Sequence, residues 1–354
     1  SSNVPRLNYP LIDGVVSGCP SLLLEPQRTN VIINSNSFNA NANVVVQTDN
    51  TISPDGNLNG SKITANSGTS LKLVDTNGAA SNTYIFSVFA KKGTHNIIQL
   101  GGGGIVGHAN FNLETGEHSS LGSMLYYGNG WYRCSVQFSA GTPTSHYVSF
   151  SDNINANRLS TSNSDGNIFL YGMQSETGYM TSYIPTNGQS GGVTRSAETC
   201  NGAGTSDTFN DSEGVLMVEG ALLSELINDA RISISDGSSV ENRITFRFLD
   251  DNEFSAQTGF TNGFDETVTL SSIVDYNKIA LVYNSSNASI FINGFKVATN
   301  TMSALSGLSQ LQFNRFGGSA NDFYGNTKQI QYFDTADIDL EQLTSWDSFR
   351  DMAI

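Results

Sequence analysis

The sequence has little charge and no long apolar run. Only 14% of its 354 residues are Asp, Glu, Lys or Arg, and 32 acidic against 17 basic residues give a net charge of −15. Nucleic acids and anionic membranes attract basic surfaces, so this balance argues against both as partners. No stretch approaches the roughly 18 consecutive apolar residues that a membrane-spanning helix needs. We therefore expect no membrane insertion.

Cysteine, proline and histidine are also scarce. Cys19, Cys134 and Cys200 cannot all pair with one another and form no Cys-x-x-Cys spacing, so we interpret them as free thiols. The seven prolines are too few for a proline-rich disordered chain. The four histidines show no His-x-His or His-x-x-x-His spacing, and no Gly-x-Ser-x-Gly motif occurs. The sequence therefore predicts no cofactor, apart from a calcium ion for which one acidic cluster offers ligands.

Apolar and polar residues alternate in short segments spaced about ten residues apart, and Gly, Asn and Ser separate these segments. Such a pattern is typical of antiparallel strands that bury one face. The sequence therefore predicts an all-β chain of antiparallel β-sandwich, or jelly-roll, domains. The expected strands are 43–48, 61–65, 70–74, 84–91, 131–138, 147–150, 168–174, 214–220, 231–237, 242–248 and 328–334. A short helix is expected near 339–350, with Asp339 as its N-cap.

The segment 278–299 is the clearest structural signal. It predicts three strands joined by tight turns, and the second turn is Asn293-Gly294. Asn-Gly between alternating apolar residues favours a two-residue hairpin turn, because both turn positions need a positive φ.

The length favours two domains. Composition breaks near residues 30, 186 and 212 set their expected limits. We interpret 1–30 as an extended arm in which Ser21–Pro26 contains one strand, 31–185 as the first sandwich, 186–212 as a linker or ordered crossover, and 213–354 as the second sandwich.

Several segments resemble sequences that recur in bacteriophage tail and fibre proteins and in prophage-derived proteins. These are Gly18–Asn30, Ser53–Gly56, Gly130–Arg133, Thr181–Thr186 and Thr194–Ala197. Residues 31–185 resemble a carbohydrate-binding-module jelly roll, and 213–354 resemble a concanavalin-A-like, laminin-G-like sandwich. The resemblance implies a virion-surface, extracellular protein that binds a host-surface glycan, in a homo-oligomer for which a trimer is favoured.

Four aromatic residues, Tyr126, Tyr127, Trp131 and Tyr132, surround Gly128-Asn129-Gly130. Aromatic rings in a polar loop suit sugar binding, because the C–H groups of a sugar pack on a ring while its hydroxyls bond polar neighbours. The alternative is that Trp131 starts a strand and lies in the core. Both interpretations stay open on the sequence.

The densest carboxylate group is Asp250-Asp251-Asn252-Glu253. It is either a polar turn between two strands or a calcium site formed by Asp250, Asp251 and Glu253, since calcium takes six to eight oxygen ligands. Sandwich glycosidases of the laminarinase type are similar and carry Glu-x-Asp-x-x-Glu on one strand. Here Phe248 stands at the first acidic place, so we expect no two-carboxylate catalysis. Asp55, in Ser53-Pro54-Asp55-Gly56, likewise fits either a turn or a calcium loop.

The sequence thus predicts a non-enzymatic glycan-binding module. Two alternatives remain open. One is a polysaccharide depolymerase or lyase that uses Tyr, His and Arg, and the other is a purely structural capsid-decoration or fibre-spacer protein.

Overall fold

The computed structural model describes residues 4–12, 15–77, 84–103, 107–138, 145–259, 263–315 and 320–346. Strands dominate these residues, and the single helix among them, α1 (Leu340–Thr344), is one turn long. No helix in the described ranges is long and apolar enough to cross a membrane. The prediction of an all-β chain is confirmed.

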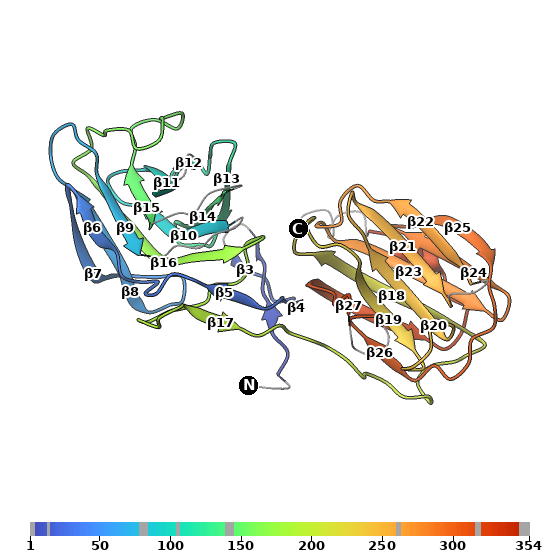
Figure 1. Ribbon diagram of the computed structural model, residues 1–354. Helices are drawn as coiled ribbons and strands as arrows, with labels where there is room; N and C mark the ends of the chain where they lie inside the picture. The colour runs from blue at the N-terminus through green and yellow to red at the C-terminus, as the bar shows by residue number, and fades with distance from the viewer. Residues whose placement is uncertain are drawn as a thin grey trace. The chain divides into compact units, whose positions relative to one another are not determined.

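The chain forms two compact units, each a sandwich of two antiparallel sheets (Figure 1). The first sandwich comprises Leu11–Val16 and Gln27–Ser196. The second comprises Ser1–Pro10, Ser17–Pro26 and Ala197–Ile354. The chain therefore starts in the second sandwich, builds the first, and returns.

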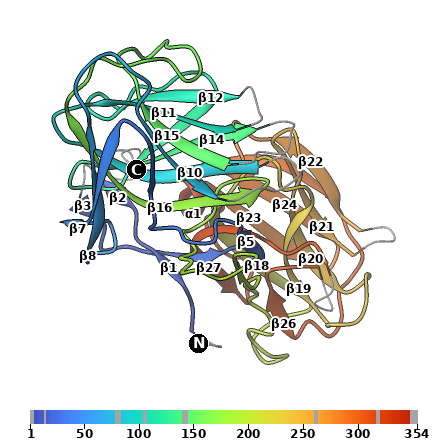
Figure 2. The same ribbon diagram turned by 60° about the vertical axis from the view of Figure 1, so that its left-hand side comes forward.

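The first sandwich faces a six-stranded sheet against a five-stranded sheet (Figures 1 and 2). The six-stranded sheet runs in the order β13 (Gly122–Tyr126), β14 (Trp131–Phe138), β10 (Tyr84–Lys92), β16 (Asn167–Thr177), β8 (Leu58–Ala65) and β7 (Val44–Ile52). The five-stranded sheet runs β12 (His108–Asn112), β11 (Ile97–Gly103), β15 (Ser145–Phe150), β9 (Leu73–Asn77) and β6 (Asn39–Ala42).

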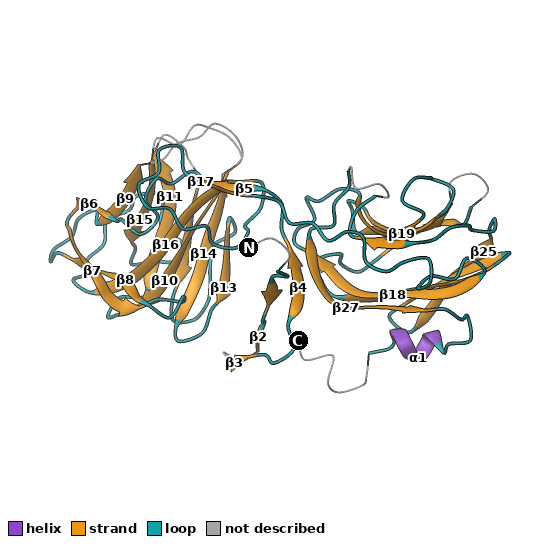
Figure 3. Cartoon of the chain, turned by 90° about the horizontal axis from the view of Figure 1, so that it is seen from below, coloured by secondary structure: helices purple, strands orange, loops and turns teal. Residues whose placement is uncertain are grey.

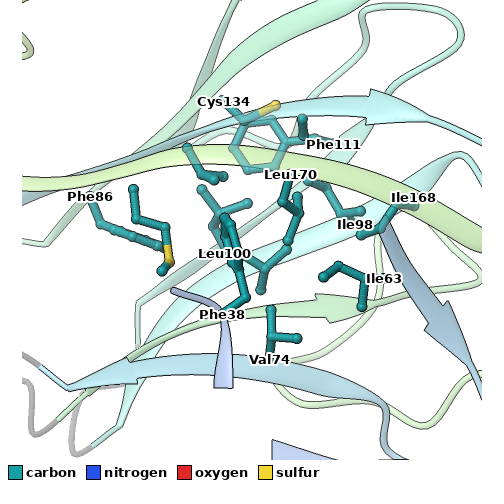
Figure 4. Packing of buried hydrophobic residues seen from close by; sticks show 14 of the residues in the cluster. Phe38, Ile63, Val74, Phe86, Ile98, Leu100, Phe111, Cys134, Ile168 and Leu170 are labelled. Carbon is teal, nitrogen blue, oxygen red and sulfur yellow. The ribbon is translucent and has the colours of Figure 1, made fainter. Parts of the chain in front are cut away.

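Alternation along β10 decides what lies between these sheets. Tyr84, Phe86, Val88 and Ala90 are all buried in the core, as the period-two pattern predicts. Figure 4 shows Phe86, Leu100 and other apolar side chains filling this space. Phe89 points to the opposite face of the six-stranded sheet, where it joins a separate aromatic cluster. The outer face of this sheet is therefore also apolar at one place.

The second sandwich pairs a seven-stranded with a five-stranded sheet. The first runs β1 (Leu7–Asn8), β4 (Ser21–Leu24), β27 (Gly325–Phe333), β18 (Glu213–Leu222), β23 (Asn277–Asn284), β24 (Asn287–Ile292) and β25 (Phe295–Thr301). The second runs β22 (Asp265–Thr269), β21 (Glu253–Thr258), β20 (Arg243–Phe248), β19 (Ala230–Ser235) and β26 (Gln310–Gln312).

Helix α1 covers the outer face of the seven-stranded sheet (Figure 3). Its Leu340 packs with Val215 and Met217 of β18, so this strand is buried on both faces. The Asp339 side chain accepts a 3.0 Å hydrogen bond from the Gln342 N–H, which confirms the predicted N-cap. The predicted helix extended to 350, and residues from 347 onward lie outside the described ranges.

Residues 1–30, interpreted from the sequence as an extended arm, contain short strands that pair with one another and with strands of the two sandwiches. The predicted strand in Ser21–Pro26 exists as β4, but it pairs with both β1 and β27 and so belongs to the second sandwich. Arg6 ion-pairs with Glu25 and with Glu198, the latter at 2.9 Å. Sequence alternation indicated a strand but carried no information about a partner 300 residues away. Between β1 and β4 the chain forms a short hairpin of β2 (Leu11–Ile12) and β3 (Val15–Val16).

The expected linker, 186–212, is ordered and divided between the sandwiches. Its strand β17 (Val193–Arg195) pairs with β5 (Arg28–Asn30) in the first sandwich. Farther along, Ala203 exchanges backbone hydrogen bonds with Leu311 in the second. The glycine and serine content predicted a break in the strand pattern here. The backbone pairing shows that one half of the segment belongs to the first sandwich and the other half to the second.

The Asn293-Gly294 turn joins β24 to β25 as predicted, with φ of 50° and 88°. Asn293 also fixes the neighbouring strand, since its Oδ1 accepts the Lys278 N–H at 2.9 Å. The Gly294 N–H donates to Thr344 Oγ1 at 3.1 Å, which ties the turn to the end of α1.

We expect Gly294→Val to destabilise the protein by about 1–3 kcal/mol, because a β-branched residue resists a positive φ. An added Cβ would also lie 3.4 Å from Ser345. Urea unfolding of the variant and the parent measures this loss. The exposed Val297→Ala in β25 serves as control, and equal midpoints for Gly294→Val and the parent would contradict the turn geometry.

Candidate functional site

The hairpin loop between β13 and β14 carries the predicted aromatic residues. Gly128, Asn129 and Gly130 have successive positive φ values of 82°, 52° and 77°. The Tyr127 N–H donates to the Trp131 carbonyl at 2.8 Å, and the Trp131 N–H donates to the Gly128 carbonyl at 2.9 Å. These bonds close a tight loop and hold Tyr127 beside Trp131, the first residue of β14.

The structure separates the four aromatic residues onto two faces of the sheet. The rings of Tyr126 and Tyr132 contact one another at a tilt, with centroids 5.1 Å apart, and Tyr132 packs against the main core. Tyr127 and Trp131 take the other face, where Tyr127 meets Phe89 edge to face at 4.9 Å. The prediction of one shared ligand-binding set of Tyr126, Tyr127, Trp131 and Tyr132 therefore has to be divided.

Trp131 is buried, as the second of the two alternatives for this residue predicted. Its side chain is 2% exposed, and its indole N–H donates to the Ile52 carbonyl at 3.1 Å. A ring with no exposed face cannot receive a sugar, so Trp131 supports the surface from below. Tyr127, at 38% exposed, is the member of this face that solvent reaches.

Beneath Tyr127 lies an aromatic cluster formed by Phe89, Trp131, Tyr171 and Tyr183. Phe89 lies 5.9 Å from Tyr171 and 6.0 Å from Tyr183, centroid to centroid, and Tyr171 lies 5.4 Å from Tyr183. The Arg133 guanidinium sits over the Phe89 ring at 5.3 Å. Rings packed edge to face around a common centre restrict one another, so the exposed ring rests on a rigid base.

Asp55 anchors the polar side of this cluster. Its carboxylate accepts hydrogen bonds from Ser53 Oγ, the Asn57 N–H, Asn59 Nδ2 and Tyr171 Oη, at 2.6–3.0 Å. Partial burial alone would raise the pKa of Asp55, but the donors Ser53, Asn59, Asn57 and Tyr171 outweigh it and hold this pKa well below its ordinary 3.8. All four partners are hydrogen-bond donors from the protein, and the Gly56 N–H donates to the Ser53 carbonyl at 3.0 Å, so Asp55 lies in a turn, one of the two alternatives that the sequence left open.

Four residues near Asp55 were not singled out from the sequence: Tyr171, Tyr183, Ser35 and Asn36. Tyr171 is buried, and its Oη donates to Asp55. Tyr183 Oη bonds Ser35 Oγ and also donates to Asn36 Oδ1 at 3.3 Å. Burial raises the pKa of Tyr183 to about 12, so this hydroxyl stays protonated and can donate. Residues from 35 to 183 meet here only through the fold, and their spacing in the sequence gave no signal.

The acidic group at 250–253 is a turn between β20 and β21. Asp251 and Asn252 have φ of 54° and 60°, and the Glu253 N–H donates to the Asp250 carbonyl at 3.1 Å. Asn252 Oδ1 accepts the Ile273 N–H at 3.0 Å. Within the described ranges no three His, Cys, Asp or Glu side chains meet as a ligand set. The calcium interpretation of Asp250, Asp251 and Glu253 thus has no support in the geometry.

The three cysteines are free thiols, as predicted, and Cys134 is fully buried. Burial raises the pKa of the Cys134 thiol far above its ordinary value, so it stays protonated. It packs as a small apolar residue in the core of the first sandwich.

No protein-family model matches the sequence, and no curated protein matches it. Among solved structures, the chain is similar to the Ruminococcus gnavus IT-sialidase CBM40, with 16% identity over 42% of this chain and 97% of that one, and a TM-score of 0.35. It is also similar to a SAP-like pentraxin from Limulus polyphemus, with 10% identity over 44% and 77% and a TM-score of 0.33. Domain 4 of the Geobacillus stearothermophilus arabinanase AbnA gives 9% over 40% and 70%, with a TM-score of 0.33. At these TM-scores the similarities carry no conclusion about what this chain binds.

We expect Glu253→Gln to change the unfolding free energy by only a few tenths of a kcal/mol, as for ordinary surface substitutions. If the 250–253 segment is only a turn, the melting temperatures of parent and variant should respond equally to calcium and to a chelator. If calcium raises the melting temperature of the parent and not that of the variant, the segment is a calcium site after all.

Asp55 makes stability depend on pH. Because its pKa is lower in the folded chain than the ordinary 3.8, the charged carboxylate contributes stability above about pH 4, and this contribution is lost as pH falls toward the folded value. We expect Asp55→Asn to lower stability near neutral pH and to show a smaller loss between about pH 5 and about pH 2 than the parent. Urea unfolding across this range is the measurement. Asp207→Asn, an exposed aspartate, is the control, and parallel pH profiles for Asp55→Asn and the parent would contradict the role.

Proposed function

We propose that the chain is a non-enzymatic glycan-binding module, with Tyr127 as the ring on which a sugar packs. The observation that carries this proposal is the position of Tyr127, half out of the surface and seated on a rigid aromatic cluster. Sugar recognition needs an exposed ring with polar groups beside it. Both conditions meet on the outer face of the six-stranded sheet.

The polar groups lie on either side of the cluster. Lys91 neighbours the loop at Gly130, and Asn36 lies beside Tyr183. The hydrogen bonds of Asp55 and Tyr171 hold the base of the cluster in place. The cluster is therefore already ordered in the free protein. A preorganised surface of this kind favours binding, because little conformational freedom is lost when the ligand arrives.

The larger setting of the module is part of the proposal. The segments Gly18–Asn30 and Gly130–Arg133 resemble bacteriophage tail and fibre sequences, which favours a virion-surface protein that binds a host-surface glycan. One exposed tyrosine gives a weak single site. A homo-oligomer, with a trimer favoured by the resemblance, would raise the avidity through several copies that bind at once.

We expect Tyr127→Ala to weaken binding to a neutral oligosaccharide by about tenfold, which corresponds to about 1.4 kcal/mol. The oligosaccharide is chosen as the strongest binder on an array of neutral host-surface glycans, and Kd is then measured by calorimetry. Phe295→Ala is the control, since Phe295 is an exposed aromatic residue (74%) in the second sandwich. Equal losses in both variants, or no binder on the array, would refute the site.

The same samples test the enzymatic alternative. The parent is incubated with a polysaccharide panel, and reducing ends and unsaturated products are measured. We expect neither to accumulate. Product release that needs the folded parent would replace the binding module with a depolymerase or lyase.

A further inference from the structure

A pocket of about 200 Å³ opens between the two sheets of the second sandwich. It lies where the five-stranded sheet ends, at its edge strand β26 (Figure 1). This strand has only three residues, whereas the other sheet continues past β18 to the nine-residue β27 and on to β4. The shorter sheet therefore leaves a gap at this side, and residues 203–209 cover only part of it.

Alternation along the strands directs apolar side chains into this pocket. The two neighbours of Leu216 in β18 pack under α1 on the outer face, so Leu216 points inward. Leu216 pairs with Tyr332 of β27, and directly opposed residues of an antiparallel pair share a face. Ile234 of β19 and its partner Leu311 of β26 form the facing wall. Leu216 and Ile234 are fully buried, whereas Tyr332 and Leu311 stay partly exposed beside the opening.

The segment that covers the gap is fixed at both ends. Ala203 exchanges two backbone hydrogen bonds with Leu311, at 2.7 and 3.0 Å. At the other end the Asn210 N–H donates to Tyr332 Oη at 2.8 Å, and the Phe209 ring meets the Tyr332 ring edge to face at 5.0 Å. Closing the pocket would break these contacts, so the pocket is held open.

Gly204 shapes the rim of the pocket. Its φ is 84°, and an added Cβ would lie 2.5 Å from the Phe209 ring. Glycine therefore lets this ring lie directly against the backbone, where it is only 7% exposed. The Phe209 ring and the Tyr332 ring together form an aromatic wall of the pocket.

The polar side chains of the lining are already engaged within the protein, and none of the described lining residues carries a charge. Tyr332 Oη lies 2.8 Å from Tyr283 Oη, and Thr208 Oγ1 accepts the Thr205 N–H at 3.1 Å. The Gln331 amide donates to a neighbouring glutamine at 2.8 Å. An ion or a sugar ring placed here would lose its hydrogen bonds to water and gain few in return. An apolar ring would instead displace water that has few partners in the pocket.

The size and the wall of the pocket favour an aromatic ring. An engineered apolar cavity of about 150 Å³ in another protein binds benzene. The volume of about 200 Å³ therefore accommodates one six-membered ring with a small substituent. A ring in the pocket can add to the edge-to-face pair of Phe209 and Tyr332, whereas an aliphatic ring fills the same space without this contact.

We propose that this pocket binds a small uncharged molecule that contains one aromatic ring. The rim residues Ala203, Gly204 and Thr208 are exposed, so a polar substituent on the ring reaches water. The site lies in the second sandwich, does not involve Tyr127 and is independent of glycan binding.

The test compares three six-membered rings: benzyl alcohol, cyclohexylmethanol and myo-inositol. Binding to the full chain is measured by ligand-observed NMR titration. We expect benzyl alcohol to bind about threefold or more tightly than cyclohexylmethanol, because only the aromatic ring adds to the aromatic wall. We expect myo-inositol to bind at least about tenfold more weakly than benzyl alcohol. Absence of benzyl alcohol binding, or equal binding of benzyl alcohol and cyclohexylmethanol, would overturn the proposal.

A filling variant locates the site. Ala203 lies directly opposite Leu311 and shares its face, so Ala203→Leu places a larger side chain over the pocket. We expect this variant to bind benzyl alcohol about tenfold more weakly than the parent, because the pocket has no spare volume for both groups. Ala304→Leu makes the same change at another exposed position of the sandwich and should leave Kd unchanged. Thermal unfolding shows that each variant is folded.

An enlarging variant tests the site in the opposite direction. Leu311→Ala removes part of one wall, so 1-naphthalenemethanol, which has two fused rings, should bind this variant about tenfold more tightly than it binds the parent. If Ala203→Leu keeps the parent's Kd for benzyl alcohol and Leu311→Ala gains nothing for the larger ring, the probe binds elsewhere and the proposal is wrong.

Two further measurements separate this pocket from other binding places. Tyr127→Ala should leave benzyl alcohol binding intact, and its loss there would assign the ring to the surface of the first sandwich and refute the pocket. Sedimentation of the parent with and without benzyl alcohol checks another occupant, an apolar side chain of a second copy. Dissociation of an oligomer by the probe would assign the pocket to that contact and overturn the ligand proposal.

Discussion

Both sandwiches depend on the alternation of side chains along single β-strands. On β10 it places Phe86 and Val88 in the core and Phe89 on the outer face. On β20 it places Phe246 in the core and Arg247 outside. The core uses one face of each sheet, and the chemistry of the other face is then free to differ. A one-residue shift in either strand would exchange the two sets, so the register that builds the core also builds the site.

The two outer faces differ in how they are stabilised. In the first sandwich the face carries one aromatic cluster, and one carboxylate beside it, Asp55, receives hydrogen bonds from four neutral donors. These bonds order the polar side of the cluster without a ligand. In the second sandwich, Asp229 forms ion pairs with both Arg231 and Arg247 on the face of the five-stranded sheet. The overall charge of −15 describes neither surface, because recognition depends on the local arrangement.

Local patterns predicted strand identity well and spatial neighbours poorly. The range 131–138 coincides with β14, and Asn293-Gly294 forms the expected turn, since both depend on residues close in sequence. A run of glycines such as that at 101–104 is typical of a flexible turn, yet Gly101–Gly103 lie inside β11. The reason is long-range: a side chain at Gly101 would collide with the ring of Tyr147, on the neighbouring strand. Glycine is needed there for space, and sequence alone does not distinguish this need from flexibility.

The candidate sites show the same limit more sharply. Clustering in sequence grouped Tyr126 with Tyr127, although adjacent residues in extended chain point to opposite faces. It missed Tyr171 and Tyr183, which reach the cluster from β16 and the segment after it. Arg231 and Arg247 alternate with apolar residues along β19 and β20, so each one alone looks like an ordinary outward-facing position. Only the pairing of β19 with β20 makes them neighbours, so the ion pairs that both form with Asp229 become visible once the register is known.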